Sequence, residues 1–259
     1  MPKIHRWCRI DAAGCINCRS VQYTQSSVIS DDLAAAWELS ARERALFDRR
    51  EGHFCLKCGM SKRVRMLAWT VRRLFPDIKT RAVLHFNQIN RFHPVLDGAC
   101  ELTETVYRPE MESGKRINGM VNQDMMCLGF EDHSFDLAVH SDTLEHIIDF
   151  EKALSEVRRV LKPGGFQIYT VPLLHRRRTR QRITLDSDGK YLNLLTPSGH
   201  GSEGEYPVVW EFGGDFLKNR RPWNAQVHYD NFWANPTVFT ISEQKPRQEL
   251  SVRNRMTEK

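Results

Sequence analysis

The stretch at residues 122–165 constrains the fold more than any other part of the chain. It contains an acidic loop, a short apolar strand at 135–140, an amphipathic helix, and a Pro-Gly-Gly turn into a second apolar strand at 166–171. Strands that alternate with helices predict a parallel sheet covered by helices on both faces. We therefore expect an α/β protein with a doubly wound sheet.

The same stretch reads NQDMMCLGFEDHSFDLAVHSDTLEHIIDFEKALSEVRRVLKPGG. It resembles the second half of class I S-adenosylmethionine-dependent methyltransferases (methyltransferase type 11-like), in which D-x-x-x-L-x-F-x-D-x-S-F-D, L-E-H and R-V-L-K-P-G-G recur in this order. Residues 37–68, WELSARERALFDRREGHFCLKCGMSKRVRMLA, are similar to the front of a bacterial subgroup that carries a cysteine-rich module. The resemblance implies a Rossmann-like fold with seven mostly parallel strands, the last one antiparallel. It also implies S-adenosyl-L-methionine as the cofactor and S-adenosyl-L-homocysteine as the product.

Two C-x-x-C pairs stand near the amino terminus, Cys15 with Cys18 and Cys55 with Cys58. Two such pairs can place four thiolates around one tetrahedral Zn²⁺ ion. Four cysteines leave no open coordination position, so we predict a structural zinc site. Buried free cysteines or a redox pair are the alternatives. We interpret Cys8 as a spare thiol, and the pattern leaves its role as a ligand open.

The chain divides into three predicted parts. Residues 1–70 form a cysteine-rich helical module, and residues 71–245 form the methyltransferase domain with a substrate-loop insert at 175–215. Residues 246–259 have few apolar side chains and are predicted to form a flexible tail. An amphipathic segment that starts at Ser61 is predicted to join the module to the α/β domain.

The resemblance places the cofactor at the carboxyl ends of the strands. The first strand, at 81–86, is followed by Asn87-Gln-Ile-Asn90, where the family usually has a glycine-rich turn. This departure is either a variant in which amide side chains bind the amino acid end of the cofactor, or a plain polar loop that weakens cofactor binding.

Two acidic residues match positions that the family uses for the nucleoside. Glu104, preferred over Glu101, corresponds to the carboxylate that accepts hydrogen bonds from the ribose. Asp124 corresponds to the acid that accepts the adenine amino proton, unless it only caps a turn. The predicted cofactor-binding residues are Phe86, Asn87, Gln88, Glu104, Asp124, Met125, His140 and Ser141.

Methyl transfer from a sulfonium needs alignment of the acceptor, and a base only if the acceptor starts protonated. His200 is flanked by glycines and is the first candidate for a general base, with a structural turn histidine as the alternative. His146 is the second candidate, and bracing of its loop is the alternative. The basic run HRRRTRQR at 175–182 either holds an anionic group of the acceptor or forms a solvated loop.

Composition limits the class of protein. The chain of 259 residues is 41% hydrophobic, its net charge is +6, and it lacks the ~20 consecutive apolar residues of a membrane span. Without a recognisable secretory signal we expect a cytoplasmic location. A charge excess of this size does not by itself indicate nucleic acid, and the oligomeric state is not readable.

The predicted function is methyl transfer to an oxygen, less favourably a nitrogen or carbon, of a small-molecule or sugar-like acceptor. RNA or protein methylation is one alternative. A binding protein that has lost catalysis is the other.

Overall fold

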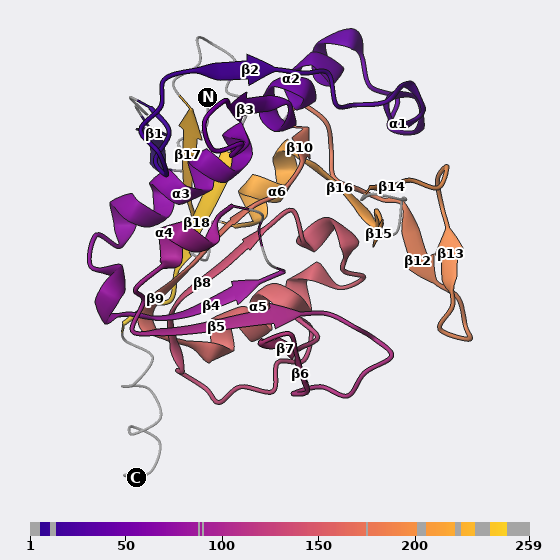
Figure 1. The fold of residues 1–259 in the computed structure, drawn as a ribbon. Coiled ribbons are helices and arrows are strands. Elements are labelled where there is room, and N and C mark those ends of the chain that lie inside the picture. The colour runs from indigo at the N-terminus through magenta and orange to yellow at the C-terminus, as the bar shows by residue number, and fades with distance from the viewer. Residues whose placement is uncertain are drawn as a thin grey trace.

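The computed structural model describes residues 6–10, 14–87, 89, 91–174, 176–200, 206–220, 224–230 and 239–247. Its described part is built around a nine-stranded sheet (Figure 1) in the order β1-β17-β18-β9-β8-β4-β5-β7-β6. The strands in this order are β1 (Arg6–Ile10), β17 (Gln226–Asp230), β18 (Phe239–Gln244), β9 (Leu161–Thr170), β8 (Phe135–Ser141), β4 (Ala82–Phe86), β5 (Glu101–Val106), β7 (Met120–Asn122) and β6 (Arg116–Ile117).

The inner seven strands confirm the predicted mostly parallel sheet. Strand β18 runs antiparallel to both β9 and β17, as expected for the last strand. Two edge strands go beyond the prediction: β1 pairs parallel with β17, and β6 pairs antiparallel with β7. The sheet is therefore wider than the family pattern implies, because one strand is added at each edge.

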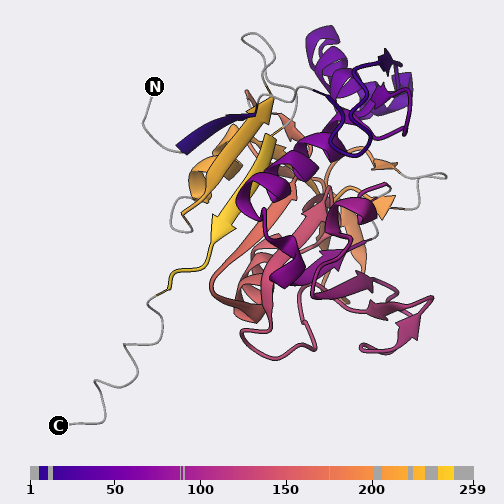
Figure 2. The ribbon, with the colours of Figure 1, turned by 60° about the vertical axis from the view of Figure 1, so that its left-hand side comes forward.

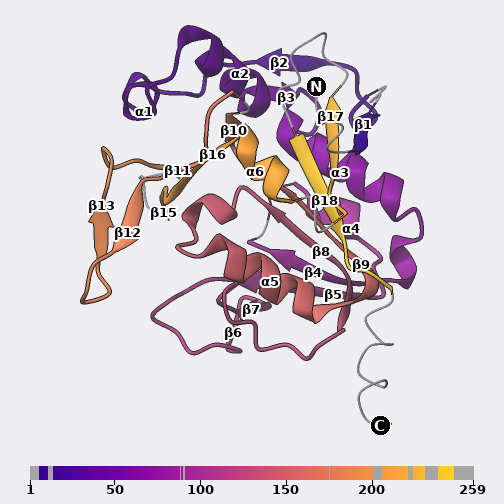
Figure 3. The ribbon, with the colours of Figure 1, turned by 180° about the vertical axis from the view of Figure 1, so that it is seen from behind.

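Helices cover both faces of the sheet. Helices α3 (Lys62–Leu74) and α4 (His93–Leu96) lie on one face, and α5 (Phe150–Val160) and α6 (Gly214–Asn219) lie on the other (Figures 1 and 3). Alternate residues of the central strands face these two layers: Val83 packs with Leu67 beneath α3, while Leu84 packs with Leu154 beneath α5. This alternation explains why the strands read as continuous apolar runs.

The predicted turn between helix and strand differs in one detail. Helix α5 ends at Val160, and β9 begins at once with Leu161, so the Pro-Gly-Gly sequence lies inside the strand. The pairing of β8 with β9 shifts register at this point. Gly164 has a φ of +82°, a left-handed conformation that favours glycine, so the irregularity depends on this residue.

The described residues 14–61 form what we call the N-terminal module. Strand β2 (Tyr23–Gln25) pairs antiparallel with β3 (His53–Cys55), and helices α1 (Asp31–Ala36) and α2 (Ala41–Glu51) lie between them in the chain. Ser40 and Glu43 form a capping box that fixes the start of α2. Helix α3 continues from the module onto the sheet. The predicted domain boundary at residue 70 falls within this helix, and the boundary stays a prediction.

The insert folds into short strands beside the N-terminal module (Figures 1 and 2). Strand β10 (Leu173–Leu174) leads into it, and it holds β11 (Arg180–Gln181), β12 (Ile183–Leu185), β13 (Tyr191–Asn193), β14 (Gly199–His200), β15 (Tyr206–Pro207) and β16 (Trp210–Gly213). Short 3-10 helices cover Ile78–Thr80 and Leu144–His146. Across the described residues, every helix is too short or too polar to cross a bilayer. Residues 248–259 of the predicted tail lie outside the described part.

Candidate functional site

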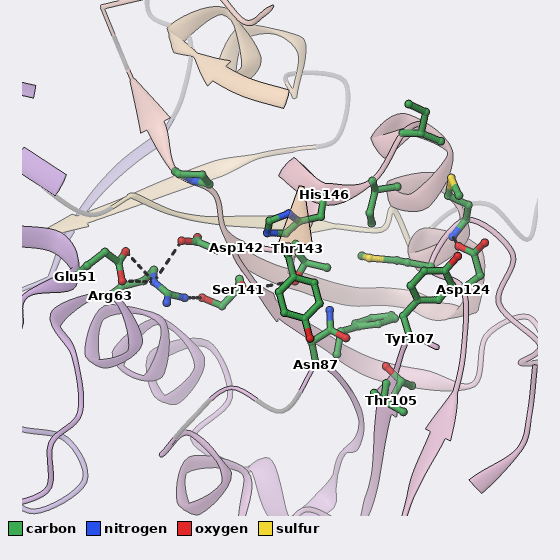
Figure 4. A pocket seen from close by; sticks show the side chains of 18 of the residues that line it. Glu51, Arg63, Asn87, Thr105, Tyr107, Asp124, Ser141, Asp142, Thr143 and His146 are labelled. Atoms are coloured by element: carbon green, nitrogen blue, oxygen red, sulfur yellow. Dashed lines mark hydrogen bonds and ion pairs between the residues drawn. The ribbon is translucent and has the colours of Figure 1, made fainter. Parts of the chain in front are cut away.

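A cavity of about 780 Å³ lies where strands β4, β5, β7 and β8 end. The carboxyl ends of these parallel strands meet at one edge of the sheet, which is where open α/β sheets bind ligands. Figure 4 shows side chains from several of these strands facing a common space. We call its sheet side, made of Phe86, Asn87, Thr105, Asp124, Met125 and Ser141, the sheet-edge wall. All of these except Thr105 were predicted from the sequence to bind the cofactor.

Asn87 explains how the first turn works without glycine. Its φ is +51°, and its backbone N–H donates to the carbonyl of Thr105 at 3.0 Å. Asparagine adopts the left-handed conformation more readily than most residues. The turn therefore has the backbone geometry that a glycine would otherwise supply. Gln88, the other predicted residue of this turn, lies outside the described residues.

Asp124 caps a turn, which was the alternative role left open by the sequence, and its adenine contact stays a prediction. Its Oδ1 accepts a hydrogen bond from the backbone N–H of Met126 at 2.8 Å, which closes a tight turn. The residue also lines the cavity (Figure 4), next to the apolar side chains of Met125 and Met126. The turn holds the carboxylate in place at the edge of the sheet.

Glu104 lies outside the cavity. Its Oε1 is 3.0 Å from Nδ1 of His85, a buried residue of β4, and 3.5 Å from Nδ1 of His93. Burial lowers the pKa of His85, and the Glu104 carboxylate partly offsets that effect. Successive side chains of a strand point to opposite sides, so the neighbouring Thr105 takes the place at the cavity. The structure does not support the predicted contact between Glu104 and the ribose.

His140 is also displaced from its predicted position. Its ring is fully buried and stacks on Tyr169 with centroids 4.7 Å apart, while Phe86 meets it edge-on at 6.1 Å. Burial lowers the pKa of His140 to about 3, so the ring is neutral at physiological pH. His140 therefore packs behind Phe86 and does not line the cavity.

Asp142 anchors an ion-pair cluster at the end of β8. Its carboxylate accepts two hydrogen bonds from Arg50, at 2.6 and 2.7 Å, and one from Thr170 Oγ1 at 2.8 Å. Burial alone would raise the pKa of Asp142, but the charges of Arg50 and Arg63 outweigh it and hold the pKa well below its ordinary value. Asp142 also has a φ of +47°.

Residues of the α2–α3 region complete this cluster, which sequence reasoning missed. Arg63 Nε lies 3.0 Å from both carboxylate oxygens of Glu51, and Arg63 also donates to Ser141 (Figure 4). Arg50 and Glu51 end helix α2, so the cluster joins the N-terminal module to the sheet edge. The sequence signal available for this cluster was the charged pair Arg50 and Glu51 at the end of a predicted helix. Asp142, the partner of Arg50, is far away in the sequence, so the sequence does not show that they meet.

The opposite side of the cavity comes from the N-terminal module. It is apolar, and we call it the module wall: Val28, Ile29, Leu33, Trp37, Leu39 and Phe47. Trp37 and Phe47 meet edge to face at 5.8 Å and are both buried. Ile147, Ile148 and the insert tyrosines Tyr191 and Tyr206 continue the lining.

His146 lines the cavity between the two walls (Figure 4). Its Nδ1 is 2.8 Å from the carbonyl oxygen of Pro207, which can only accept, so Nδ1 carries a proton. In the neutral ring, Nε2 therefore holds the lone pair. Nε2 lies 3.8 Å from the buried carboxylate of Glu145. His146 thus braces its loop and keeps a basic nitrogen.

The other predicted base, His200, has only its backbone described. It belongs to β14, which pairs antiparallel with β15. Its side chain lies outside the described residues, as do His175 and the side chain of Cys8.

Arginines of the basic run hold the insert against the N-terminal module. Arg177 donates to both carboxylate oxygens of Glu43 at 2.7 Å and to the carbonyl of Trp37 at 2.8 Å. Arg182 donates to the carbonyl of Ala36 at 2.9 Å. Trp37 Nε1 donates to Ser198 Oγ at 2.6 Å. The arginines of this run therefore stabilise the contact between the insert and the N-terminal module.

The four predicted cysteines come together, which confirms the cluster. One Sγ atom from each of Cys15, Cys18, Cys55 and Cys58 lies within 4.8 Å of all the others. The closest pairs are Cys15 with Cys58 at 3.4 Å and Cys18 with Cys55 at 3.5 Å. Both C-x-x-C turns pack on the core beneath α3.

Comparison with known proteins relates one segment of the chain to a known family. Residues 96–169 match the family described as a methyltransferase domain. The chain is 36% identical over 86 residues to the ubiquinone/menaquinone biosynthesis C-methyltransferase of Paracoccus denitrificans, covering 29% of this chain and 34% of that protein. It is 43% identical over 58 residues to the demethylmenaquinone methyltransferase of Staphylococcus aureus, covering 22% of each. The chain thus spans about a third or less of these relatives.

A solved structure of 1,6-didemethyltoxoflavin-N1-methyltransferase from Burkholderia thailandensis is also similar. Its TM-score is 0.45 at 12% identity, over 88% of this chain and 97% of that chain. The matched segment holds strands β5 to β8 and most of β9, so this part of the chain is similar to the methyltransferase domain family and lies within a mostly parallel sheet.

Proposed function

We propose that this protein transfers a methyl group from S-adenosyl-L-methionine to an oxygen of a small-molecule acceptor, in preference to a nitrogen or carbon. The observation that carries the proposal is the cavity at the carboxyl edge of the sheet. It brings together Asn87, Asp124 and Met125, three residues that match positions of the family's cofactor motifs. Its volume, about 780 Å³, is large for a ligand pocket and suits two ligands side by side.

The residues of the sheet-edge wall fit the cofactor. Asp124 would accept the adenine amino group, and Met125 would pack on the ring. Asn87 would approach the amino acid end through its left-handed turn. The buried Thr105 would offer a hydroxyl to the ribose, where the family uses a carboxylate. When bound, the cofactor supplies an electrophilic methyl group on a sulfonium.

The chain's own contribution to catalysis is alignment and proton removal. His146 would accept the proton of the acceptor hydroxyl at Nε2, because Nδ1 already donates to Pro207. The Glu145 carboxylate would stabilise the resulting imidazolium. His200 stays a prediction, since its side chain lies outside the described residues.

We also propose a structural Zn²⁺ ion at the cysteine cluster. Four thiolates about 2.3 Å from a tetrahedral ion stand roughly 3.8 Å apart, which agrees with Sγ atoms that all lie within 4.8 Å. A site closed by four cysteines leaves the ion no position for substrate. The ion would hold the two C-x-x-C turns together beneath the module.

A polymer acceptor is less favoured than a small molecule. Arg177, Arg180 and Arg182 of the basic run engage Glu43, Glu211 and backbone carbonyls within the chain. These three arginines therefore already make contacts within the fold. Binding of an RNA substrate would instead need such side chains for contacts with phosphate groups. The apolar module wall also suits a sugar-like acceptor less well than the sequence alone suggested.

Calorimetry with S-adenosyl-L-homocysteine tests the proposal directly. We expect saturable binding that Asp124→Ala weakens about tenfold or more, because a charged hydrogen-bond acceptor is lost. Asp132→Ala is the matched control, since Asp132 is exposed and outside the cavity lining. If neither the methyl donor nor its product bound at millimolar concentration, the proposed function would be wrong.

A further inference from the structure

We propose that the N-terminal module is the acceptor-recognition element of this enzyme and that the acceptor is an uncharged, planar aromatic alcohol. The inference rests on the proposed function and names the substrate class of the same cavity. It follows from the module wall, from the ion pairs at its border, and from the position of His146.

The module wall is shaped and fixed before any ligand arrives. Ile29, Leu33 and Trp37 recur at four-residue intervals, so they form one face of α1 and its flanks. Trp37 is 4% exposed and Phe47 is 7% exposed, and their rings support each other. Such a rigid apolar surface favours a ligand that buries flat apolar area, and it offers little to a hydroxyl-rich sugar.

The far side of the same space is also made of rings and branched chains. Tyr206 lies 5.9 Å from the ring of His146, and Tyr191 and Ile147 lie in the same lining. A lining of aromatic and branched side chains is suited to a planar group.

Charge at the border of the module wall argues against an ionised acceptor. Arg50 pairs with Asp142 at 2.6 Å, and Arg63 pairs with Glu51 at 3.0 Å. An anionic acceptor would have to displace one of these carboxylates from its arginine. A cationic acceptor would meet the same neutralised cluster, so the wall selects an uncharged molecule.

His146 adds a polar requirement for the acceptor. His146 lines the cavity, and its Nε2 is the nitrogen left to accept a proton, because Nδ1 donates to Pro207. An aromatic hydroxyl is acidic enough to give its proton to imidazole during methyl transfer, whereas an aliphatic sugar hydroxyl is a much poorer donor. The acceptor oxygen would lose this proton to Nε2 and form a bond to the methyl carbon while the bond from that carbon to the sulfonium sulfur breaks, which would leave S-adenosyl-L-homocysteine.

The experiment uses the full chain with 2-naphthol as the probe and methyl α-D-glucopyranoside as the sugar-like comparison. Tritium transfer from labelled S-adenosyl-L-methionine reports methylation, and naphthol fluorescence reports binding. We expect methylation and binding of 2-naphthol and no detectable transfer to the glucoside. Preference for the glucoside would overturn the proposal.

Variants of the wall separate recognition from a general effect on the fold. Leu33→Glu places a carboxylate in the module wall, and we expect 2-naphthol affinity to fall at least tenfold with little change in S-adenosyl-L-homocysteine affinity. Val28→Glu does the same at a position that is 43% exposed, where folding is not at risk. Leu56→Glu is the control, because Leu56 is exposed on the same module and outside the cavity lining. If the affinity for 2-naphthol were unchanged in both Leu33→Glu and Val28→Glu, the proposal would be contradicted.

The two proposals fail in different ways. If the wild-type chain did not bind S-adenosyl-L-homocysteine, the proposed function would fail, while naphthol fluorescence without cofactor would still test the module wall. If cofactor bound but naphthol did not, the acceptor class would be wrong and the methyltransferase assignment would stand. A histidine variant tests the hydroxyl requirement: His146→Asn should lower kcat for 2-naphthol ~10²–10⁴-fold and leave its binding unchanged. A normal kcat would remove His146 from that role.

Discussion

The two walls of the cavity are held in place by different interactions. The sheet-edge wall stands on parallel strands, whose backbone pairing fixes residues such as Thr105 and Ser141 relative to one another. The module wall depends on side-chain contacts between distant segments, such as Glu43 with Arg177 and Trp37 with Ser198. One wall is part of the sheet, and the other is attached to it.

This difference suggests a division of labour. A pocket for a shared cofactor needs the same geometry in every relative, which the sheet supplies. A pocket for a particular acceptor can be carried by an attached module, which changes without disturbing the sheet. The Asp142 cluster is the joint between the two, because it binds Arg50 of the module at the end of β8.

Loss of the metal should separate the two walls most strongly. Structural zinc sites contribute on the order of 10 kcal/mol or more to the folding of small modules. We expect Cys55→Ser to lose bound zinc, to open the described module to limited proteolysis, and to abolish 2-naphthol binding. Affinity for S-adenosyl-L-homocysteine should change less than about threefold, because the strands that hold it are paired by backbone hydrogen bonds in which none of the four cysteines takes part.

Zinc content and calorimetry on the same preparation check this outcome. Cys100→Ser is the control, since Cys100 is exposed and outside the cysteine cluster. Equal loss of cofactor and naphthol binding in Cys55→Ser would show that the walls are not separable.

Breaking the joint should have the next largest effect. Asp142→Asn removes one of the two carboxylates that pair with the buried Arg50, the other being that of Glu51, and loss of a partner from a buried ion pair costs up to about 3–5 kcal/mol. Asparagine tolerates the left-handed backbone of this position, where φ is +47°, so the change tests charge and not strain. Urea unfolding measures the loss. Asp132→Asn, at an exposed pair with Arg159, should cost less than about 1 kcal/mol.

The sequence predicted the sheet-edge wall well because its signals are local. The motif from Asp124 onward and the apolar run before Ser141 each place residues at a strand end. The cysteine spacing likewise indicated that four thiols could meet. In each case neighbouring residues in the chain carry most of the geometry.

The predictions that the structure does not support depended on the register of strands or on contacts between residues far apart in the sequence. Glu104 and Thr105 differ by one position, and only pairing with β4 decides which of them faces the cavity. His140 was misplaced for the same reason, since its neighbour Ser141 takes the cavity side. The module wall needed knowledge of contacts across more than a hundred residues. The four-residue spacing of Ile29, Leu33 and Trp37 was its one local signal.

A pair of variants sharpens the account of the sheet-edge wall. Thr105→Val removes a hydroxyl at nearly constant volume, and the loss of one hydrogen bond to the ribose should weaken S-adenosyl-L-homocysteine binding about threefold to tenfold. Glu104→Gln should leave that affinity within about twofold, because Glu104 contacts His85. Calorimetry on both variants decides whether Thr105 or Glu104 contacts the ribose. The reverse pattern would restore the assignment made from the sequence.

The smallest expected effect concerns the attachment of the module wall to the insert. Hydrogen bonds from Arg177 lower the pKa of Glu43 from 4.5 to about 2, against an opposing effect of burial. Because the folded pKa is depressed, the pair contributes stability above pH 4.5 and loses it as the pH falls towards 2. Since Glu43 is partly solvated, Glu43→Gln should cost only about 1 kcal/mol at pH 7.

Urea midpoints of Glu43→Gln and the wild type, measured from pH 7 downwards, should therefore converge in acid. Glu38→Gln is the matched control, because Glu38 is 71% exposed and its pair with Arg180 is longer, at 3.1 Å. If the gap between Glu43→Gln and the wild type stayed constant down to pH 2, the charge of Glu43 would not be what holds the insert. The attachment would then depend on packing around Trp37 and on hydrogen bonds to uncharged acceptors, such as those from Arg177 and Arg182 to backbone carbonyls, and the acceptor preference would be insensitive to pH in this range.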